Sequence, residues 1–159
     1  MTNTNIEELL VYIGSFTGRK SEGISIFRFD ASSGALELVG KAGQGLSCSW
    51  IAVDPGQCSL YAIDEVGEFS GRPGGAVCAF SLDPDTGELT YLNRQPSNGT
   101  GPCYLSFDRT GGLLFVGNYF SGSVSVLPIQ EDGRVGEATD FIEHRGSSVN
   151  AERQEGPHV

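Results

Sequence analysis

Residues 104–127 read YLSFDRTGGLLFVGNYFSGSVSVL, and this stretch decides the fold. It runs from an alternating strand through an Asp-Gly turn into a second apolar strand, after which a glycine opens a third strand. The same layout occurs earlier, in WIAVDPGQCSLYAID at residues 50–64 and GGAVCAF at residues 74–80. Self-similarity at a regular spacing indicates a repeat architecture.

The spacing of the repeat identifies the kind of unit. Trp50 and Tyr104 occupy matching positions 54 residues apart. The second strand recurs at Leu10–Gly14, with Leu10 matched to Leu60 and Leu114, and the third strand recurs at Gly23–Phe27. The glycines that close the turns are separated by 53 and 46 residues: Gly34, Gly87 and Gly133. A period near 50 residues with four short strands is typical of a β-propeller blade, whereas helical repeats would show a 3.6-residue periodicity.

The sequence predicts three blades, the first without its innermost strand. The expected strands lie at residues 9–14, 24–29 and 35–41, then at 48–53, 59–64, 76–82 and 88–94, and finally at 104–108, 113–118, 123–129 and 138–144. Gly156–Val159 aligns with Gly101–Tyr104, at the entrance to a further blade. Since a closed propeller needs at least four blades, we expect an incomplete ring and a truncated sequence, with a polar tail at residues 1–8 and the propeller portion at residues 9–159.

Composition restricts the possible partners. The 159 residues include 10 basic and 20 acidic side chains, a formal net charge of −10, which argues against nucleic acid or an anionic membrane surface. No apolar run approaches the roughly 20 residues that cross a bilayer, and residues 1–5 lack a signal pattern. We therefore expect a cytoplasmic protein. The four cysteines have neither metal-ligand nor redox spacing, so we expect reduced thiols and no metal or cofactor.

The two faces of the predicted array carry different connections. One face has compact Asp-Gly turns, and the other has the long loops at about residues 15–23, 65–75, 95–103 and 145–157, where function usually lies. Arginine binds phosphate and carboxylate groups through two parallel hydrogen bonds, so basic residues on these loops favour an anion pocket, although loop solvation explains any single one more simply. Five of the ten basic residues lie there: Arg19, Lys20, Arg72, Arg145 and Arg153.

Several candidates for chemistry belong to the same face. His158 would enter an innermost strand at the mouth of the channel, where an imidazole could take a proton from a water that attacks a carbonyl. A residue at a chain end is more often inert, which is the simpler interpretation. Asp64, Glu65, Asn118 and Tyr119 stand at the ends of second strands, where they either converge on a ligand or cap turns and pack blades.

Five blocks of sequence between residues 64 and 158 carry a resemblance to a known family. The blocks are Asp64–Phe69, Gly71–Val77, Gly101–Cys103, Asn118–Tyr119 with Ser121–Val124, and Arg153–His158. Together they resemble the seven-bladed propeller lactonases, a family that includes bacterial 6-phosphogluconolactonases and carboxymuconate cycloisomerases. The similarity runs from about residue 10 to the last residue. It implies hydrolysis of a sugar-derived lactone, with 6-phosphogluconolactone as the foremost substrate and without a metal.

The resemblance also implies roles for individual residues. His158 would be the catalytic acid or base, and Arg153 would stabilise a substrate anion or the oxyanion. The implied candidates for substrate binding are four further residues: Glu65, Asn118, Tyr119 and Arg72.

The chain departs from the family pattern at Asp64, where the family usually has Asn, and at Tyr104, where many members have His. A cycloisomerase acting on a carboxymuconate-type acid and a non-catalytic propeller binding module are alternative interpretations. Because further catalytic groups would lie in the missing blades, we expect this chain alone to have little lactonase activity. Open blade ends also predict self-association through apolar faces and unpaired edges.

Overall fold

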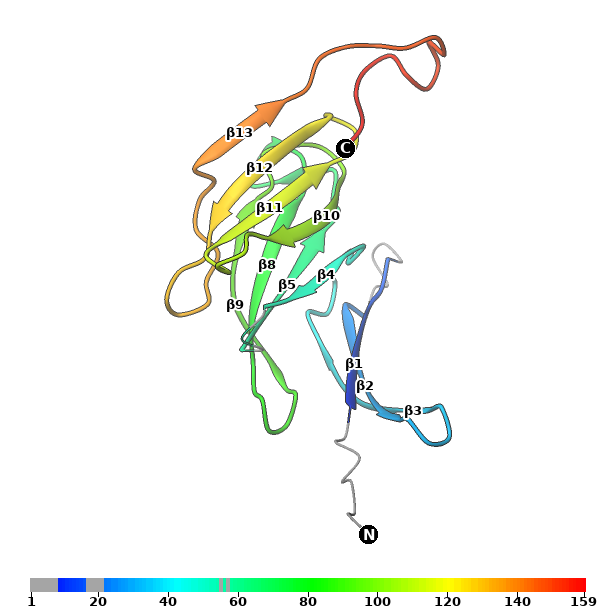
Figure 1. The fold of residues 1–159 in the computed structure, drawn as a ribbon, viewed down its shortest axis with the longest axis vertical. Coiled ribbons are helices and arrows are strands. Elements are labelled where there is room, and N and C mark those ends of the chain that lie inside the picture. The colour runs from blue at the N-terminus through cyan, green and yellow to red at the C-terminus, as the bar shows by residue number, and fades with distance from the viewer. Residues whose placement is uncertain (1–8, 17–21, 55, 57) are drawn as a thin grey trace.

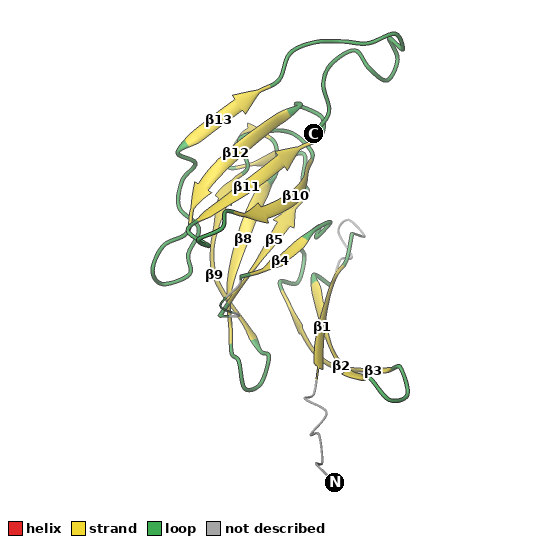
Figure 2. Ribbon diagram, viewed as in Figure 1, coloured by secondary structure: helices red, strands yellow, loops and turns green. Residues whose placement is uncertain are grey.

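The computed structural model describes residues 9–16, 22–54, 56 and 58–159. The predicted tail at residues 1–8 and the candidates Arg19 and Lys20 lie outside the described residues. Every regular element in the described part is a strand, as Figure 2 shows. In that part of the chain, accordingly, there is no helix of the length and apolarity needed to span a membrane. The all-β prediction is confirmed.

Three antiparallel sheets follow one another along the chain, here named blades 1, 2 and 3 (Figure 1). Blade 1 consists of β1 (Leu9–Gly14), β2 (Ile24–Asp30) and β3 (Ala35–Ala42); blade 2 of β4 (Ile51–Val53), β5 (Ser59–Asp64), β8 (Ala76–Leu82) and β9 (Leu89–Pro96); and blade 3 of β10 (Pro102–Phe107), β11 (Leu113–Asn118), β12 (Ser123–Pro128) and β13 (Asp140–Glu143). Within each sheet the strands lie side by side in chain order. The predicted strands agree with these bounds to within a few residues.

The loop predicted at residues 65–75 differs from expectation, because it contains a small hairpin. Strands β6 (Glu68–Phe69) and β7 (Arg72–Pro73) pair antiparallel. The two residues between them, Ser70 and Gly71, both have positive φ, at 54° and 76°. Such a pair of left-handed residues makes a tight turn whose twist suits a hairpin. This loop, which the sequence predicts as a long connection, therefore contains regular strand pairing.

Blade 2 is buried on both of its faces. All six residues of β5 are buried, and successive side chains of a strand point to opposite sides. Leu60 and Ala62 belong to the core shared with blade 1, whereas Tyr61 and Ile63 belong to the core shared with blade 3. Burial on both sides explains why this strand is a continuous apolar run instead of an alternating one.

A tyrosine hydroxyl joins each pair of neighbouring blades. Tyr12 donates to the carbonyl of Gly87 at 2.9 Å, and Tyr61 donates to the carbonyl of Gly133 at 2.9 Å. Each acceptor is the glycine that closes a turn in the next blade. Tyr12 therefore corresponds to Tyr61, and the sequence match that placed Leu10 opposite Leu60 is one residue out of register. Apolar letters alone do not distinguish the two registers, since the side chains of blade 2 are buried on both faces.

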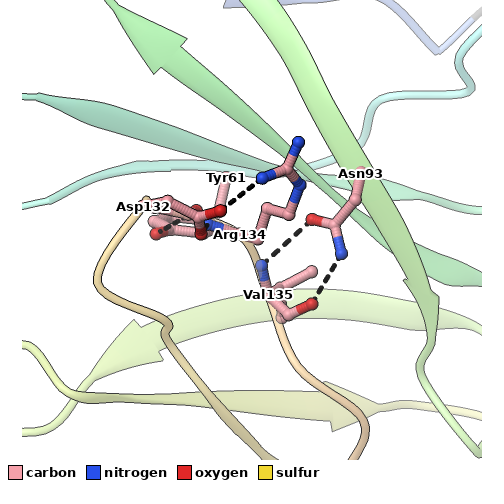
Figure 3. A network of polar contacts seen from close by, with 6 residues as sticks. Tyr61, Asn93, Asp132, Arg134 and Val135 are labelled. Atoms are coloured by element: carbon pink, nitrogen blue, oxygen red, sulfur yellow. Dashed lines mark hydrogen bonds and ion pairs between the residues drawn. The ribbon is translucent and has the colours of Figure 1, made fainter.

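A second polar contact reinforces the joint between blades 2 and 3 (Figure 3). The side-chain amide of Asn93 in β9 donates to the carbonyl of Val135 at 2.7 Å, and its oxygen accepts from the Val135 amide at 3.0 Å. Beside it, Arg134 pairs with the Asp132 carboxylate. Asn93 thus hydrogen-bonds to the loop after β12 as a neighbouring strand would. These bonds satisfy backbone groups that would otherwise face an apolar core.

Both ends of the array expose apolar side chains. Leu36, Leu38 and Val39 of β3 are exposed, and so are Phe141 and Ile142 of β13. The predicted self-association through these surfaces stays a prediction.

Close backbone approaches at glycine fix how one blade follows another. A Cβ added at Gly75, just before β8, would lie 2.5 Å from Cγ of Pro102 and 2.6 Å from the carbonyl oxygen of Asp64. The corresponding Gly122, before β12, has φ +57°, and its Cβ would lie 2.2 Å from the carbonyl oxygen of Pro157. In both cases the chain entering the next innermost position runs directly against a glycine, which no larger residue could replace without movement.

We expect Gly75→Ala to lower the free energy of unfolding by about 1–3 kcal/mol, because the added methyl overpacks the contact with Pro102. Urea unfolding of the purified chain measures this loss. Gly67→Ala is the matched control, since nothing lies within 4 Å of its added Cβ. Equal stability of the two variants would contradict the steric argument.

Candidate active site

His158 lies at the point where the last residues of the chain pass the end of blade 3. Its ring stacks on Tyr119, with the ring centroids 4.4 Å apart and the planes 15° from parallel. Nδ1 lies 3.0 Å from the carbonyl oxygen of Tyr119, and Nε2 lies 3.1 Å from the carbonyl oxygen of Arg153. A carbonyl only accepts hydrogen bonds, and a neutral imidazole has one N–H to donate. A neutral ring can therefore donate to only one of the two carbonyls.

Arg153 reaches this cluster through its backbone. Its carbonyl oxygen contacts His158, and its amide donates to the carbonyl of Asn150 at 3.1 Å within a turn. The side chain is exposed, and the ion pairs found among the described residues do not involve it. The guanidinium is consequently available to a ligand anion.

Asn118 and Tyr119 are neighbours in sequence but differ in environment. Tyr119 is 38% exposed and contacts His158, whereas Asn118 is fully buried. The Asn118 amide donates to the carbonyl of Ser97 and to the hydroxyl of Ser123, both at 3.3 Å, while its Oδ1 has no hydrogen-bond partner. The structure therefore brings Tyr119 to the cluster and turns Asn118 toward the interior, where it supports the end of β11.

Glu65 lies beside Cys103 at the start of the innermost strand of blade 3. Burial raises the pKa of the Cys103 thiol, and the negative charge of Glu65 raises it further. The thiol also approaches the carbonyl oxygen of Val159, the residue after His158, at 3.8 Å. Glu65 and the end of the histidine segment thus lie near the same cysteine.

Arg72 is placed differently from the other candidates. It is exposed on β7 and lines a cavity of about 130 Å³ together with Phe69, Pro96 and Asn98. No hydrogen bond or ion pair of the described residues connects it to His158. Its predicted role in substrate binding stays a prediction.

Asp64 forms a buried junction that the sequence analysis missed. The carboxylate is only 2% exposed; Oδ1 accepts from the Ser47 amide at 2.8 Å, and Oδ2 pairs with the Arg94 guanidinium. Arg94 in turn lies over the ring of Phe69, 4.4 Å from the centroid, and burial lowers its pKa. The ion pair itself joins β5 to β9. Asp64 also binds Ser47 on the approach to β4, and Arg94 also contacts Phe69 in the β6–β7 hairpin.

A signal for this junction was present in the sequence. Blade 3 has Asn118 where blade 2 has Asp64, and the strand pairings place Phe141 where blade 2 has Arg94. A carboxylate cannot be buried without a partner, so an acidic residue at a buried position requires a nearby cation. Comparing the two blades position by position would have found Arg94.

Among the described residues there is no group of three or more His, Cys, Asp or Glu side chains that could hold a metal ion. The four cysteines are free thiols, with Cys48 and Cys78 buried and Cys58 exposed.

The family model for seven-bladed β-propeller lactonases matches residues 10–159. The chain belongs to this lactonase family, which confirms the resemblance carried by the sequence blocks.

The relatives include enzymes with a stated activity. The chain is 35% identical over 148 residues to the 6-phosphogluconolactonase of Bacillus subtilis, a match that covers 93% of this chain and 41% of the relative. It is 28% identical over 150 residues to the 6-phosphogluconolactonase of Formosa agariphila, covering 94% of this chain and 42% of that one. The chain thus spans about two fifths of the length of these curated relatives.

Solved structures agree with the fold. A structure from Bacteroides fragilis superposes with a TM-score of 0.87 at 33% identity and covers 99% of this chain and 42% of its own. The periplasmic gluconolactonase of Pseudomonas aeruginosa superposes with a TM-score of 0.77 at 29% identity, covering 89% of this chain and 40% of its own.

The Asp64–Arg94 pair can be tested by exchanging it for the residues at the equivalent positions of blade 3, Asn118 and Phe141. Arg94→Phe should lower the free energy of unfolding by about 3 kcal/mol, because the Asp64 carboxylate stays buried without its cation. Combining it with Asp64→Asn, which reproduces the blade 3 residues, should restore most of the loss. A double-mutant cycle of urea unfolding measures the coupling. Purely additive losses would contradict a paired role.

The neighbourhood of Cys103 predicts its reactivity. Because its pKa is raised, the thiol carries little thiolate at pH 8, and we expect iodoacetamide to modify it more slowly than the exposed Cys58. Glu65→Gln removes the negative charge, lowers the pKa of Cys103 and should accelerate its modification, while Glu68→Gln should not. Mass spectrometry of timed samples measures both rates. No change with Glu65→Gln would show that Glu65 does not act on this thiol.

Proposed function

We propose that this chain forms part of a lactonase that hydrolyses 6-phosphogluconolactone to 6-phosphogluconate, with His158 as the acid–base group. The observation that carries the proposal is the position of the imidazole, held by two backbone carbonyls and the Tyr119 ring at the end of blade 3. The activity is supported by two relatives that are named 6-phosphogluconolactonases. Proton transfer by a positioned histidine is suited to ester hydrolysis near neutral pH.

The contacts of His158 assign a role to each ring nitrogen. The carbonyl of Tyr119 follows directly from β11, so the Nδ1–H bond to it sets the tautomer and leaves a lone pair on Nε2. The Nε2 contact comes from Arg153, which lies in an exposed turn. If water displaces this carbonyl, the water can donate a hydrogen bond to the basic Nε2 and act as the nucleophile.

The proposed reaction proceeds by attack of that water on the carbonyl carbon of the lactone. Nε2 takes the water proton as the new C–O bond forms, and the carbonyl oxygen becomes an oxyanion. Collapse of the tetrahedral intermediate then breaks the bond between this carbon and the ring oxygen. The imidazolium returns the proton to the departing ring oxygen, which becomes a hydroxyl, and the acid product ionises.

Positive charge is needed for the oxyanion and for the substrate phosphate. Arg153 is the candidate for one of these anions, because its backbone contacts His158 and its side chain is exposed. Arg72 on the β6–β7 hairpin is a candidate for a more distant phosphate oxygen. Glu65 and Tyr119 complete the chain's share of the pocket, with Asn118 supporting the end of β11 from within.

The proposed substrate also bears on location. Sugar phosphates are formed inside cells, so a 6-phosphogluconolactonase would work in the cytoplasm. A related gluconolactonase of P. aeruginosa is periplasmic, so family membership alone leaves the compartment open.

A hybrid enzyme tests the proposal. Residues 1–159 of this chain are joined to the part of the B. subtilis 6-phosphogluconolactonase that follows its matched region, and hydrolysis of 6-phosphogluconolactone is measured. We expect the hybrid to turn over the lactone and His158→Asn to lower kcat by about 100-fold or more, since general acid–base catalysis contributes 10²–10⁴. His144→Asn, at an exposed histidine, is the control. Unchanged turnover in His158→Asn would contradict the proposal.

A further inference from the structure

Two large aromatic side chains are exposed side by side at the innermost strands of blades 2 and 3. Trp50 immediately precedes β4 and is 40% exposed, and Tyr104 lies in β10 and is 47% exposed. Their ring centroids are 4.6 Å apart with the planes tilted by 49°. Figure 1 shows β4 and β10 next to each other, which agrees with the contacts between these strands.

Neither ring is explained by packing of the blades. The two hydrophobic cores contain other aromatic side chains, such as Tyr61 and Phe80, but neither Trp50 nor Tyr104. The tilt means that the two rings do not cover each other fully, so aromatic surface stays open to solvent. Exposed aromatic surface of this kind is typical of ligand sites, which combine apolar walls with a few polar groups.

The pair lies next to the residues of the proposed active site. Tyr104 directly follows Cys103, whose thiol approaches the carbonyl of Val159 beside His158. Trp50 also lines a cavity of about 340 Å³ together with Tyr12 and Ser49. A cavity of this volume can hold a molecule of the size of a hexose.

We propose that Trp50 and Tyr104 form a stacking wall for the ring of a cyclic sugar derivative, an inference that rests on the proposed lactonase function. The C–H face of a six-membered sugar ring is apolar and nearly flat, so it packs on aromatic rings while its hydroxyl groups remain in water. An open-chain sugar acid has no such face. The wall therefore binds the cyclic substrate better than the open-chain product, and ring opening itself weakens the contact and favours product release.

Trp50 is the single tryptophan of the chain, so its fluorescence reports on this wall directly. The purified 159-residue chain is titrated with glucose 6-phosphate, which keeps a closed ring, and with 6-phosphogluconate, which is open and has the same phosphate. We expect a saturable change of Trp50 emission, with apparent binding about 5-fold tighter for the closed ring, in keeping with the strength of aromatic packing. Equal affinity for the two compounds, or no response to glucose 6-phosphate, would overturn the proposal.

Variants of Tyr104 separate stacking from loss of fold. Tyr104→Leu should abolish the preference for the closed ring, and Tyr104→Phe should retain it because the ring remains. Tyr91→Leu removes an exposed tyrosine of β9 and should leave the titrations unchanged. A preference that persists in Tyr104→Leu would also overturn the proposal. The outcome is independent of the hybrid enzyme: a lactonase that loses turnover in His158→Asn but shows no ring preference keeps its proposed function without this wall.

Discussion

The contact on which the rest of the structure depends is the close approach between a glycine and the segment that enters the next blade. At Gly75 and Gly122 the space for a Cβ is already taken by Pro102 and by the carbonyl of Pro157. The distance between blades is therefore set by a rigid proline ring at Gly75 and by a backbone carbonyl at Gly122, neither of which can move aside by changing rotamer. His158 directly follows Pro157, so the contact between Gly122 and Pro157 fixes the backbone from which the imidazole extends. The Tyr119 stack and the two carbonyl contacts then orient a ring that is already in place.

Burial divides the sequence into parts that could and could not be predicted. The strands, their order and the three-stranded first blade follow from spacing, because the turn residues recur at a regular interval. The register of blade 1 cannot be predicted from spacing. Blade 2 is apolar on both faces, so a shift of one residue gives an equally apolar match. Tyr12 and Tyr61 establish the register only through hydroxyl bonds to glycines in other blades. Contacts of that range are invisible in a local pattern.

The candidate site was predictable to a similar extent. The motif identified His158, Tyr119 and Arg153, and the structure brings these three together. The motif could not show that Arg153 contacts the histidine through its carbonyl, because a backbone contact does not depend on the type of residue. The end of a strand on the loop face predicts that Asn118 either faces a ligand or packs blades, and the structure shows it buried and hydrogen-bonded to the carbonyl of Ser97. Its direction follows from strand alternation, because Asn118 shares a face of β11 with Leu114 and Val116, which belong to the core between blades 2 and 3.

The charges near the channel mouth bear on how an acidic protein could bind an anionic substrate. With a net charge of −10, long-range electrostatics repel the proposed sugar phosphate substrate, so its binding requires local positive charge. Arg94 does not supply it, because the Asp64 carboxylate neutralises this guanidinium and Phe69 covers its face. Asp64 therefore has a consequence beyond stability, because it keeps the partly buried Arg94 of blade 2 from binding the proposed substrate's phosphate. The anion is left to side chains without such a partner, and Arg153 is the one whose backbone is already fixed to His158.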